Sequence, residues 1–348
     1  MQALLLAGGL GTRLRPLTER LPKPMVPVFN VAWLEHLVRW LKDAGITEIV
    51  LALGYRGDKI REYCGDGTQW GVRIRYVQEE TPLGTGGAMR LAAPLLHETT
   101  FVLNADVISQ IDIDRMFAQH RSSGAKVSIA LTYVDDPTAY GVVETTRDGR
   151  VIAFTEKPSK EQVRSHCINA GAYLFEPEYL AAIPAGRPVS VEKEFFPQLL
   201  GDGVRIVGMP YRGYWKDIGT PEKYLEAHFD AMRGKWVLPI IGPLHRKSVV
   251  LGQGVKIDPK AVIRPPVFIG DHVVIEAGAV VGPMAVIGRE THIEREATVA
   301  HSVLWEAVTV EAGAVVGGAI IGTGACVTDG QGLYNRAFTG NEVEVVPA

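Results

Sequence analysis

The sequence predicts an α/β protein: a Rossmann-like domain with a mixed, largely parallel sheet, followed by a left-handed parallel β-helix. Two observations lead to this prediction. Over the first two thirds of the 348 residues, short apolar runs alternate with amphipathic stretches at helical spacing, which indicates βαβ units. Over the last third, large aliphatic residues recur at every sixth position, which indicates stacked triangular coils. We therefore expect one domain over 1–232, a connector over 233–248, and the β-helix with a C-terminal tail over 249–348.

The first apolar run, residues 3–7, predicts a buried strand that ends at the glycine pair Gly8 and Gly9. A helix is expected next, because aliphatic residues follow helical spacing at Leu34, Leu37, Val38 and Leu41. Gly45 stands where that helix would end. Further strands are expected over 48–53, 73–78, 101–104, 127–134, 142–144, 151–156 and 170–175, with helical stretches near 59–63 and 87–96. Helices become fewer after residue 127, so we expect a mixed sheet.

The C-terminal repeat has two kinds of position. The large aliphatic residues, each six apart, are Leu251, Ile257, Ile263, Ile269, Ile275, Val281, Ile287, Ile293 and Val299. Four positions after each of the first eight comes a smaller residue: Val255, Ala261, Val267, Val273, Ala279, Ala285, Thr291 and Ala297. This hexapeptide pattern stacks the aliphatic side chains into one column. The spacing slips after Val299 and restarts at Leu304, so we expect a loop or an irregular coil over 300–302.

Composition limits the classes of partner. The chain is 47% hydrophobic and 22% charged, with a net charge of −3, which argues against a general binder of nucleic acid or anionic membrane. The N-terminal apolar run has no basic leader and is cut by glycine after Ala7, so we expect neither a signal peptide nor a membrane span. Cys64, Cys167 and Cys326 have no zinc-ligand spacing, and a reducing cytoplasm is the expected location.

The loop after the first strand suits a polyphosphate. Gly8, Gly9 and Gly11 leave room for backbone N–H groups to approach phosphate oxygens, and Arg13 adds positive charge. Lys23 stands between two prolines, which restrict its backbone. The segment lacks both the lysine-bearing phosphate loop and the third glycine of the dinucleotide fingerprint. Glycine-rich loops after strands are common, so the loop taken alone leaves open whether it binds phosphate.

The order of the motifs resembles a known family. Residues 8–18 read Gly-Gly-x-Gly-Thr-Arg-Leu-Arg-Pro-Leu-Thr, and Pro-Lys-Pro follows; this string resembles the signature of the sugar-1-phosphate nucleotidyltransferases. Later matching segments are Glu-Glu-x-Pro-Leu-Gly-Thr, Leu-Asn-x-Asp-Val-Ile, Tyr-Gly-Val-Val, Glu-Lys-Pro, Asn-Ala-Gly, Val-Glu-Lys-Glu-x-Phe-Pro and Trp-x-Asp-Ile-Gly. With the hexapeptide tail, they are most similar to the branch that transfers GMP to mannose 1-phosphate. Gly86-Gly87-Ala88 departs from that branch and resembles guanylyltransferases for heptose phosphates, so the sugar stays open.

Two aspartates are the candidate metal ligands. Asp106 follows the apolar run 101–103 and so falls at a strand end, on the same edge of the sheet as the glycine loop. An aspartate there is commonly a cap or turn residue. The resemblance implies that Asp106 holds metal together with Asp217. Magnesium at a nucleotide takes one or two carboxylates with phosphate oxygens and water, so Mg²⁺ is the expected cofactor.

The resemblance also implies which residues bind the substrates. Its nucleotide side comprises Leu6, Ala7, Gly8, Gly9, Gly11, Thr12, Arg13, Glu79, Pro82, Gly84 and Thr85. Its sugar-phosphate side comprises Tyr140, Gly141, Glu156, Lys157, Asn169, Gly171, Glu192 and Lys193. Lys157 suits the 1-phosphate, while Glu156 and Asn169 can hydrogen-bond sugar hydroxyls. Glu192 and Lys193 could equally open an exposed helix.

Glu79 is the residue that bears on the base. It stands five residues before Gly84, where thymidylyl and uridylyl relatives have glutamine. A carboxylate only accepts hydrogen bonds, and guanine offers two adjacent donors, N1–H and the 2-amino group. Uracil and thymine place carbonyl oxygens beside their single N–H. The residue therefore favours guanine, with the alternative that Glu79 faces solvent and Gln78 or Glu80 reads the base.

The expected reaction is an in-line attack of a sugar 1-phosphate, with mannose as the expected sugar, on the α-phosphorus of GTP. Its catalytic residues would be Arg13, Lys23, Asp106 and Asp217. Alternatives within the family are guanylyl transfer to another sugar phosphate, such as a heptose, and thymidylyl or uridylyl transfer to glucose 1-phosphate.

Two other classes stay open. The β-helix could carry an acyl-transferring activity on His272, His292 or His301, or the chain could be a non-catalytic sensor of nucleotide sugars. Open ends of stacked coils also predict a homo-oligomer.

Overall fold

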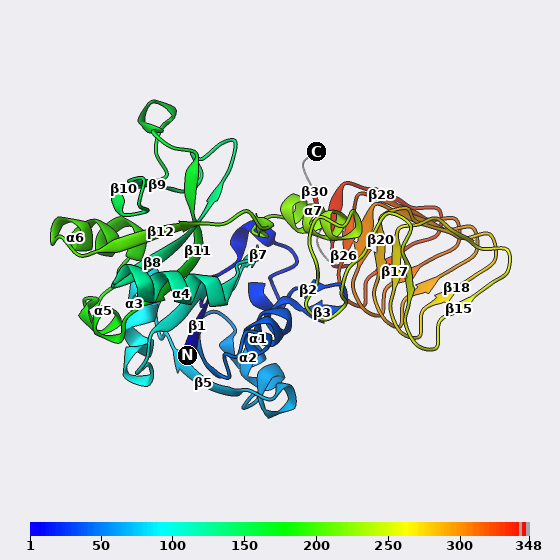
Figure 1. Cartoon of the computed structure of the whole chain (residues 1–348). Coiled ribbons are helices and arrows are strands. Elements are labelled where there is room, and N and C mark those ends of the chain that lie inside the picture. Colours follow the sequence, from blue (N-terminus) through cyan, green and yellow to red (C-terminus); the bar gives the residue numbers. More distant parts are fainter. Residues whose placement is uncertain (341–342, 346–348) are drawn as a thin grey trace. The chain divides into compact units, whose positions relative to one another are not determined.

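The computed structural model describes residues 1–340 and 343–345, and its contacts divide into two compact units (Figure 1). The first unit comprises Met1–Leu10 and Leu37–Trp215, and the second comprises Gly11–His36 and Lys216–Ala348. A segment from near the N-terminus therefore folds with the C-terminal part of the chain. The predicted domain boundaries at residues 232 and 248 stay a prediction.

The first unit is built on a mixed sheet with strand order β10-β9-β11-β6-β1-β4-β5, which β8 and β12 extend from β11. β1, β4, β5 and β6 are parallel, whereas β11 is antiparallel to β6 and β8. The predicted mixed sheet is therefore confirmed. The strands of this sheet are β1 (Gln2–Ala7), β4 (Glu48–Leu53), β5 (Arg73–Gln78), β6 (Thr100–Asn104), β8 (Val127–Tyr133), β9 (Gly141–Thr145), β10 (Val151–Glu156), β11 (Cys167–Phe175) and β12 (Ile206–Pro210), and β7 (Val107–Ser109) lies outside it.

Helices follow the strands of this sheet as the alternating pattern predicts. They are α2 (Gly57–Cys64), α3 (Gly84–Ala92), α4 (Ile113–Ser123), α5 (Pro177–Ala182) and α6 (Phe196–Gly201), with a π-helical turn at Val191–Phe195. α1 (Trp33–Asp43) begins in the second unit and ends in the first. Its later part lies against the sheet, where Trp40 meets the ring of Phe101 edge-on. Gly45 follows it with a positive φ, as expected for a helix end.

The second unit contains the predicted β-helix, formed by three sheets of short parallel strands in the described part of the chain (Figure 1). One sheet has β14 (Val249–Leu251), β17 (Val267–Ile269), β20 (Ala285–Ile287), β23 (Ser302–Leu304), β26 (Ile320–Ile321), β29 (Arg336–Phe338) and the antiparallel β30 (Val343–Val345). The second has β15 (Lys256–Ile257), β18 (Val274–Ile275), β21 (His292–Ile293), β24 (Thr309–Val310) and β27 (Cys326–Val327). The third has β16 (Val262–Ile263), β19 (Val280–Val281), β22 (Thr298–Ala300), β25 (Val315–Gly317) and β28 (Gly332–Tyr334).

The slip in the repeat is a shortened corner. Val267 pairs with Ala285, 18 residues on, whereas Ala285 pairs with Ser302, 17 residues on. The corner between β19 and β20 holds Gly282, Pro283 and Met284, but the next one holds His301 alone, in a left-handed conformation with a φ of 50°. The predicted irregularity at 300–302 is confirmed, but the coil continues through it and the alternative of a loop there is wrong.

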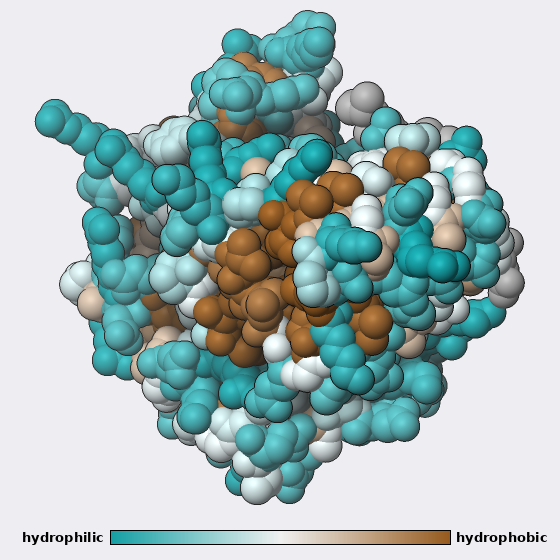
Figure 2. All heavy atoms as spheres, turned by 90° about the vertical axis from the view of Figure 1, so that its right-hand side faces the viewer, coloured by the Kyte–Doolittle hydropathy of each residue, from teal (hydrophilic) through white to brown (hydrophobic). Residues whose placement is uncertain are grey.

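The aliphatic column forms the core of the β-helix. From Ile269 to Val299 its members are at most 1% exposed. The first coil differs, because no other coil of the described residues covers it: Leu251 is 51% exposed and Val249 45%. Figure 2, which views the end of Figure 1 where β15 and β18 lie, shows apolar side chains gathered there. The strands β14, β15 and β16 also begin the strand order of their sheets, so within residues 1–340 and 343–345 each has an outer edge without a neighbouring strand.

The N-terminal segment of the second unit is clamped onto the β-helix. It forms a hairpin of β2 (Pro27–Val28) and β3 (Val31–Ala32) whose turn residues, Phe29 and Asn30, both have positive φ. The Phe29 ring lies edge-on against Phe268 of β17, and Asn30 Nδ2 donates to the carbonyl of Ile287 at 3.1 Å.

Helix α7 (Pro221–Met232) holds the other side of this turn. Phe29 N–H donates to His228 Nε2 at 3.3 Å, and His228 Nδ1 donates to the carbonyl of Tyr224 at 2.9 Å. Burial lowers the pKa of His228 to about 4, so the ring is neutral and both nitrogens are paired. The Tyr224 hydroxyl donates to the carbonyl of Pro27 and accepts from Trp305 Nε1 at 3.0 Å. α7 thus ties the hairpin and the β-helix into one packed body.

We expect Tyr224→Phe to loosen this body, because it leaves the Trp305 N–H and the Pro27 carbonyl without their partner in a buried place. The loss should be about 1–3 kcal/mol, measured as a lower urea midpoint of the second unit by tryptophan fluorescence. Tyr334→Phe, at an exposed tyrosine of the same unit, is the matched control. Equal midpoints for the two variants would contradict a stabilising role of the Tyr224 hydroxyl between the hairpin and the β-helix.

Candidate functional site

The carboxyl ends of the parallel strands gather several predicted site residues in the first unit. Leu6 and Ala7 end β1, and Gly8 and Gly9 follow it. Glu79 follows β5, and Asp106 lies in the turn between β6 and β7. Because β1, β4, β5 and β6 are parallel, these residues lie along one edge of the sheet, where α/β proteins bind ligands.

Glu79 lies against the glycine loop rather than facing solvent. A Cβ on Gly8 would lie 2.5 Å from Glu79 Oε1, so glycine is required for this approach. The other carboxylate oxygen accepts a hydrogen bond from Leu83 N–H at 2.8 Å. Burial raises the pKa of Glu79. Gln78 and Glu80, the alternative base readers, are both exposed.

Gly84 begins α3 in a conformation that suits glycine alone. Its φ is +71°, and a Cβ there would lie 2.7 Å from the carbonyl oxygen of Val189. The same carbonyl accepts from Gly86 N–H at 2.9 Å. Pro82, two residues earlier, is exposed. The 186–190 segment therefore fixes the start of this helix.

The predicted sugar side is also in the first unit. Tyr140 packs edge-on against Trp215, whose Nε1 donates to the carbonyl of Ala170 at 3.0 Å. Gly141 begins β9, and Asn169 and Gly171 lie within β11. Asn169 Oδ1 accepts from Gly171 N–H at 2.9 Å.

Glu156 and Lys157 differ in exposure. Burial and, after it, the neighbouring carboxylate of Glu192 raise the pKa of Glu156. Lys157 is exposed, and its Nζ lies 4.0 Å from Glu156 Oε1. The Lys157 ammonium group is therefore accessible to a ligand, whereas the Glu156 carboxylate is partly buried.

Glu192 lies in a hydrogen-bond network instead of simply opening an exposed helix. Its Oε2 accepts from Thr85 Oγ1 at 2.7 Å and from Ser190 Oγ at 2.9 Å, and its Oε1 accepts from the Tyr173 hydroxyl at 3.4 Å. Thr85 Oγ1 in turn accepts from Val191 N–H at 3.0 Å. Thr85, predicted on the nucleotide side, therefore positions Glu192, while Lys193 is exposed.

The second unit brings together three of the charged residues predicted for phosphate and metal: Arg13, Lys23 and Asp217. Gly11 accepts a hydrogen bond from Thr18 Oγ1 at 2.7 Å and precedes the short turn Thr12–Leu14. Lys23 Nζ lies 3.5 Å from Asp217 Oδ1, and Arg13 Nη2 lies 3.7 Å from Asp217 Oδ2. Asp217 ends β13 (Trp215–Asp217). Asp106 belongs to the first unit and Asp217 to the second.

Sequence reasoning missed two features of this site. Lys223 places its Nζ 3.8 Å from Asp217 Oδ2, although a lysine near a helix start carries no signal of such a contact. Ser190 caps the π-helical turn and supports Glu192. The Ser-x-Glu spacing is the signal that could have found it.

Asp106 and Asp217 each offer carboxylate oxygens, which are ligands that Mg²⁺ takes. Among residues 1–340 and 343–345, no three His, Cys, Asp or Glu side chains converge as a complete metal cage. A metal at either aspartate would need further oxygen ligands, such as those of a substrate. In the same residues, no helix is long and apolar enough to cross a bilayer.

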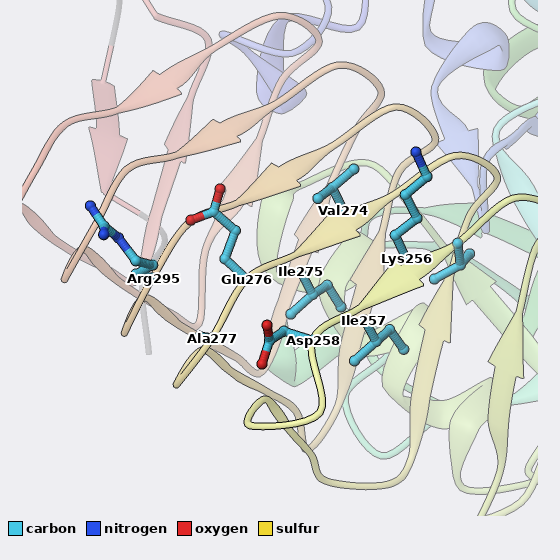
Figure 3. A pocket seen from close by; sticks show the side chains of 9 residues that line it. Lys256, Ile257, Asp258, Val274, Ile275, Glu276, Ala277 and Arg295 are labelled. Carbon is cyan, nitrogen blue, oxygen red and sulfur yellow. The ribbon is translucent and has the colours of Figure 1, made fainter.

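The β-helix carries a separate groove on the face of β15 and β18. Figure 3 shows Ile257 and Ile275 in it, with Lys256, Asp258, Glu276 and Arg295 around them. The three candidate acyl-transfer histidines are not among the residues that line this groove: His272 and His301 are exposed, and His292 Nε2 lies 2.9 Å from Oε1 of the lining residue Glu276.

Comparison with known proteins gives matches along most of the chain. The nucleotidyl transferase family model matches residues 2–233, and the model of the GMPPB C-terminal domain matches residues 263–348. The mannose-1-phosphate guanylyltransferase of Mycobacterium tuberculosis is 41% identical over 76% of this chain and 73% of its own. The mannose-1-phosphate guanyltransferase beta-A of Xenopus laevis is 41% identical over 65% and 63%.

A solved structure gives a similar picture. The crystal structure of HddC from Yersinia pseudotuberculosis has a TM-score of 0.56 and 29% identity, covering 65% of this chain and 97% of HddC. HddC has also been crystallised in complex with GMP-PN, with the same coverage and TM-score.

Proposed function

The chain belongs to the nucleotidyl transferase family, and we propose that it transfers GMP from GTP to mannose 1-phosphate, giving GDP-mannose and pyrophosphate. The observation that carries this proposal is the 41% identity to a mannose-1-phosphate guanylyltransferase over most of both chains. The second match, to the GMPPB C-terminal domain, extends the likeness into the β-helix. The similarity to guanylyltransferases therefore covers both parts of the chain.

The transfer needs positioning and charge neutralisation more than proton transfer. A phosphate monoester with a second pKa near 6 is mostly dianionic at neutral pH, so one of its oxygens can attack the α-phosphorus of GTP without a base. The new P–O bond forms as the bond to the β-phosphate oxygen breaks, and pyrophosphate leaves with the electron pair. Arg13 and Lys23 would hold the departing pyrophosphate, and Lys157 the sugar phosphate. Glu156 and Asn169 would hydrogen-bond sugar hydroxyls.

We propose that Asp106 and Asp217 hold Mg²⁺ in this reaction. When bound, the ion would neutralise charge on the α-phosphate and the attacking oxygen. The donor set supports this assignment because both groups are carboxylates and phosphate oxygens would complete the ligands. In the free protein, Asp217 is kept close to Lys23 and Arg13, the two cations assigned to the leaving group.

The proposal is tested by pyrophosphate release with Mg²⁺, crossing GTP, dTTP, UTP, ATP and CTP against mannose 1-phosphate and glucose 1-phosphate. We expect turnover confined to GTP with mannose 1-phosphate. Asp106→Asn and Asp217→Asn should lose at least about 100-fold in kcat, whereas Asp148→Asn, at an exposed turn, should not. A preference for dTTP or UTP would replace the assigned base, and activity only with another sugar phosphate would replace mannose.

Glu79 is the residue we assign to the guanine edge. This assignment is supported by the position of Glu79, which is half-buried against the glycine loop, whereas Gln78 and Glu80 are exposed. We expect Glu79→Gln to lower kcat/KM for GTP by about 10- to 100-fold, because the amide presents a donor to the guanine 2-amino group. The same variant should gain relative activity with dTTP or UTP. Glu80→Gln is the control, and an equal loss in both variants would remove Glu79 from base recognition.

We also propose that two copies of the chain associate through the open first coil of the β-helix. The coil exposes Leu251, Val249 and Val262, and the neighbouring groove has two cations and two carboxylates, which suits a self-complementary two-fold contact. Sedimentation should give a dimer that Leu251→Asp converts to monomer, while Ile152→Asp, at an exposed apolar residue of the first unit, leaves it intact. A wild-type monomer at micromolar concentration would exclude this contact.

The cytoplasm remains the proposed location.

A further inference from the structure

Lys223 is the cation beside Asp217 that the proposed reaction does not use. It extends from the first turn of α7, and its Nζ lies 3.8 Å from Asp217 Oδ2. Arg13 approaches the same oxygen at 3.7 Å, and Lys23 approaches Oδ1 at 3.5 Å. The Asp217 side chain is 15% exposed. One carboxylate is therefore surrounded by three positive charges.

The position of Lys223 runs against local preference. Thr220 is the N-cap of α7, and its Oγ1 accepts from Lys223 N–H at 3.4 Å. The third helical position after such a cap favours glutamate, whose side chain completes the capping box, and the helix N-terminus disfavours positive charge. A lysine that breaks the local rule and then pairs with a functional carboxylate points to a functional reason.

The three cations differ in their freedom to move. Lys23 is only 8% exposed and is held between prolines, so it stays beside Asp217. Arg13 is 65% exposed and Lys223 is 34% exposed. If Arg13 and Lys23 hold triphosphate oxygens as proposed, Lys223 is the remaining partner of Oδ2. A divalent cation approaching that oxygen must displace it.

We propose that Lys223 is a positioning residue that neutralises Asp217 in the free protein and keeps divalent metal from binding there until nucleotide arrives. Arg13, Lys23 and Lys223 carry three positive charges against the one negative charge of Asp217. This cluster repels a free dication and attracts a triphosphate. Once phosphate oxygens balance the cations, Asp217 becomes available to metal, so metal enters together with nucleotide. The inference rests on the proposed metal role of Asp217.

The test measures Mn²⁺ binding to the nucleotide-free protein by electron paramagnetic resonance. Lys223→Met should bind Mn²⁺ about threefold to fivefold more tightly than the wild type, the range expected for removing one partly exposed charge beside a carboxylate. Lys223→Arg should stay near the wild type because it retains the charge. Lys235→Met is the matched control: it removes another lysine of the second unit, one that pairs with Asp230 at 2.7 Å.

A double variant assigns the gain to the contact. Asp217→Asn with Lys223→Met should show no gain over Asp217→Asn alone. An unchanged Mn²⁺ affinity in Lys223→Met, or the same gain in Lys235→Met, would overturn the inference. Because the Mn²⁺ measurement needs no turnover, it is separate from the test of the proposed reaction. If guanylyl transfer fails but Lys223→Met still binds Mn²⁺ more tightly, the proposed role of Lys223 stands. If guanylyl transfer succeeds but Lys223→Met shows no gain, only the proposed role of Lys223 is overturned.

Discussion

The second unit depends on the burial of the Phe29–Asn30 turn. Both residues adopt left-handed backbone conformations, which cost energy in a residue with a side chain. The contacts of the turn offset that cost: the Phe29 ring lies against His228 and Phe268, and Asn30 bonds to the carbonyl of Ile287. The turn follows the segment that carries Arg13 and Lys23. The segment of Arg13 and Lys23 therefore belongs to the unit of α7 and the β-helix, not to the unit of the sheet whose first strand precedes it.

Carboxylates in the two units are stabilised in different ways. Asp217 is surrounded by the cationic groups of Arg13, Lys23 and Lys223 at 3.5–3.8 Å. Glu192 is held instead by hydroxyl groups of Thr85, Ser190 and Tyr173, which fix its direction without neutralising it. Burial raises the pKa of Glu156, and the charge of Glu192 adds to that effect. Hydroxyl groups that stay in place suit a carboxylate that orients a polar ligand. Lysine and arginine side chains that can change partner suit a reaction step in which negative charge moves with the leaving group.

The sequence was informative wherever a feature repeats or is local. The predicted strands 48–53 and 73–78 are β4 and β5 residue for residue, because each segment is rich in strand-forming residues and is bounded by turns. The hexapeptide column predicted the β-helix down to the residue where its spacing slips. Contacts between distant segments could not be predicted: no local pattern encodes Asn30 against Ile287, or Thr85 against Glu192. The contact of Lys223 with Asp217 could not be predicted for the same reason. A lysine in the first turn of a helix ordinarily indicates a solvated surface.

The slip in the repeat shows why the irregular part of a regular fold is informative. A hexapeptide coil needs only neighbouring coils for its stability, and nothing in that requirement explains a corner shortened to one residue. The first shortened corner is His301, whose ring lies edge-on to Phe229 of α7. Four residues later, Trp305 donates to Tyr224 of the same helix. The coil thus changes length where it meets α7, and the uniform 18-residue coils lie on its open side. Packing against α7, which also holds the Phe29 turn, accounts for this irregularity better than the repeat itself.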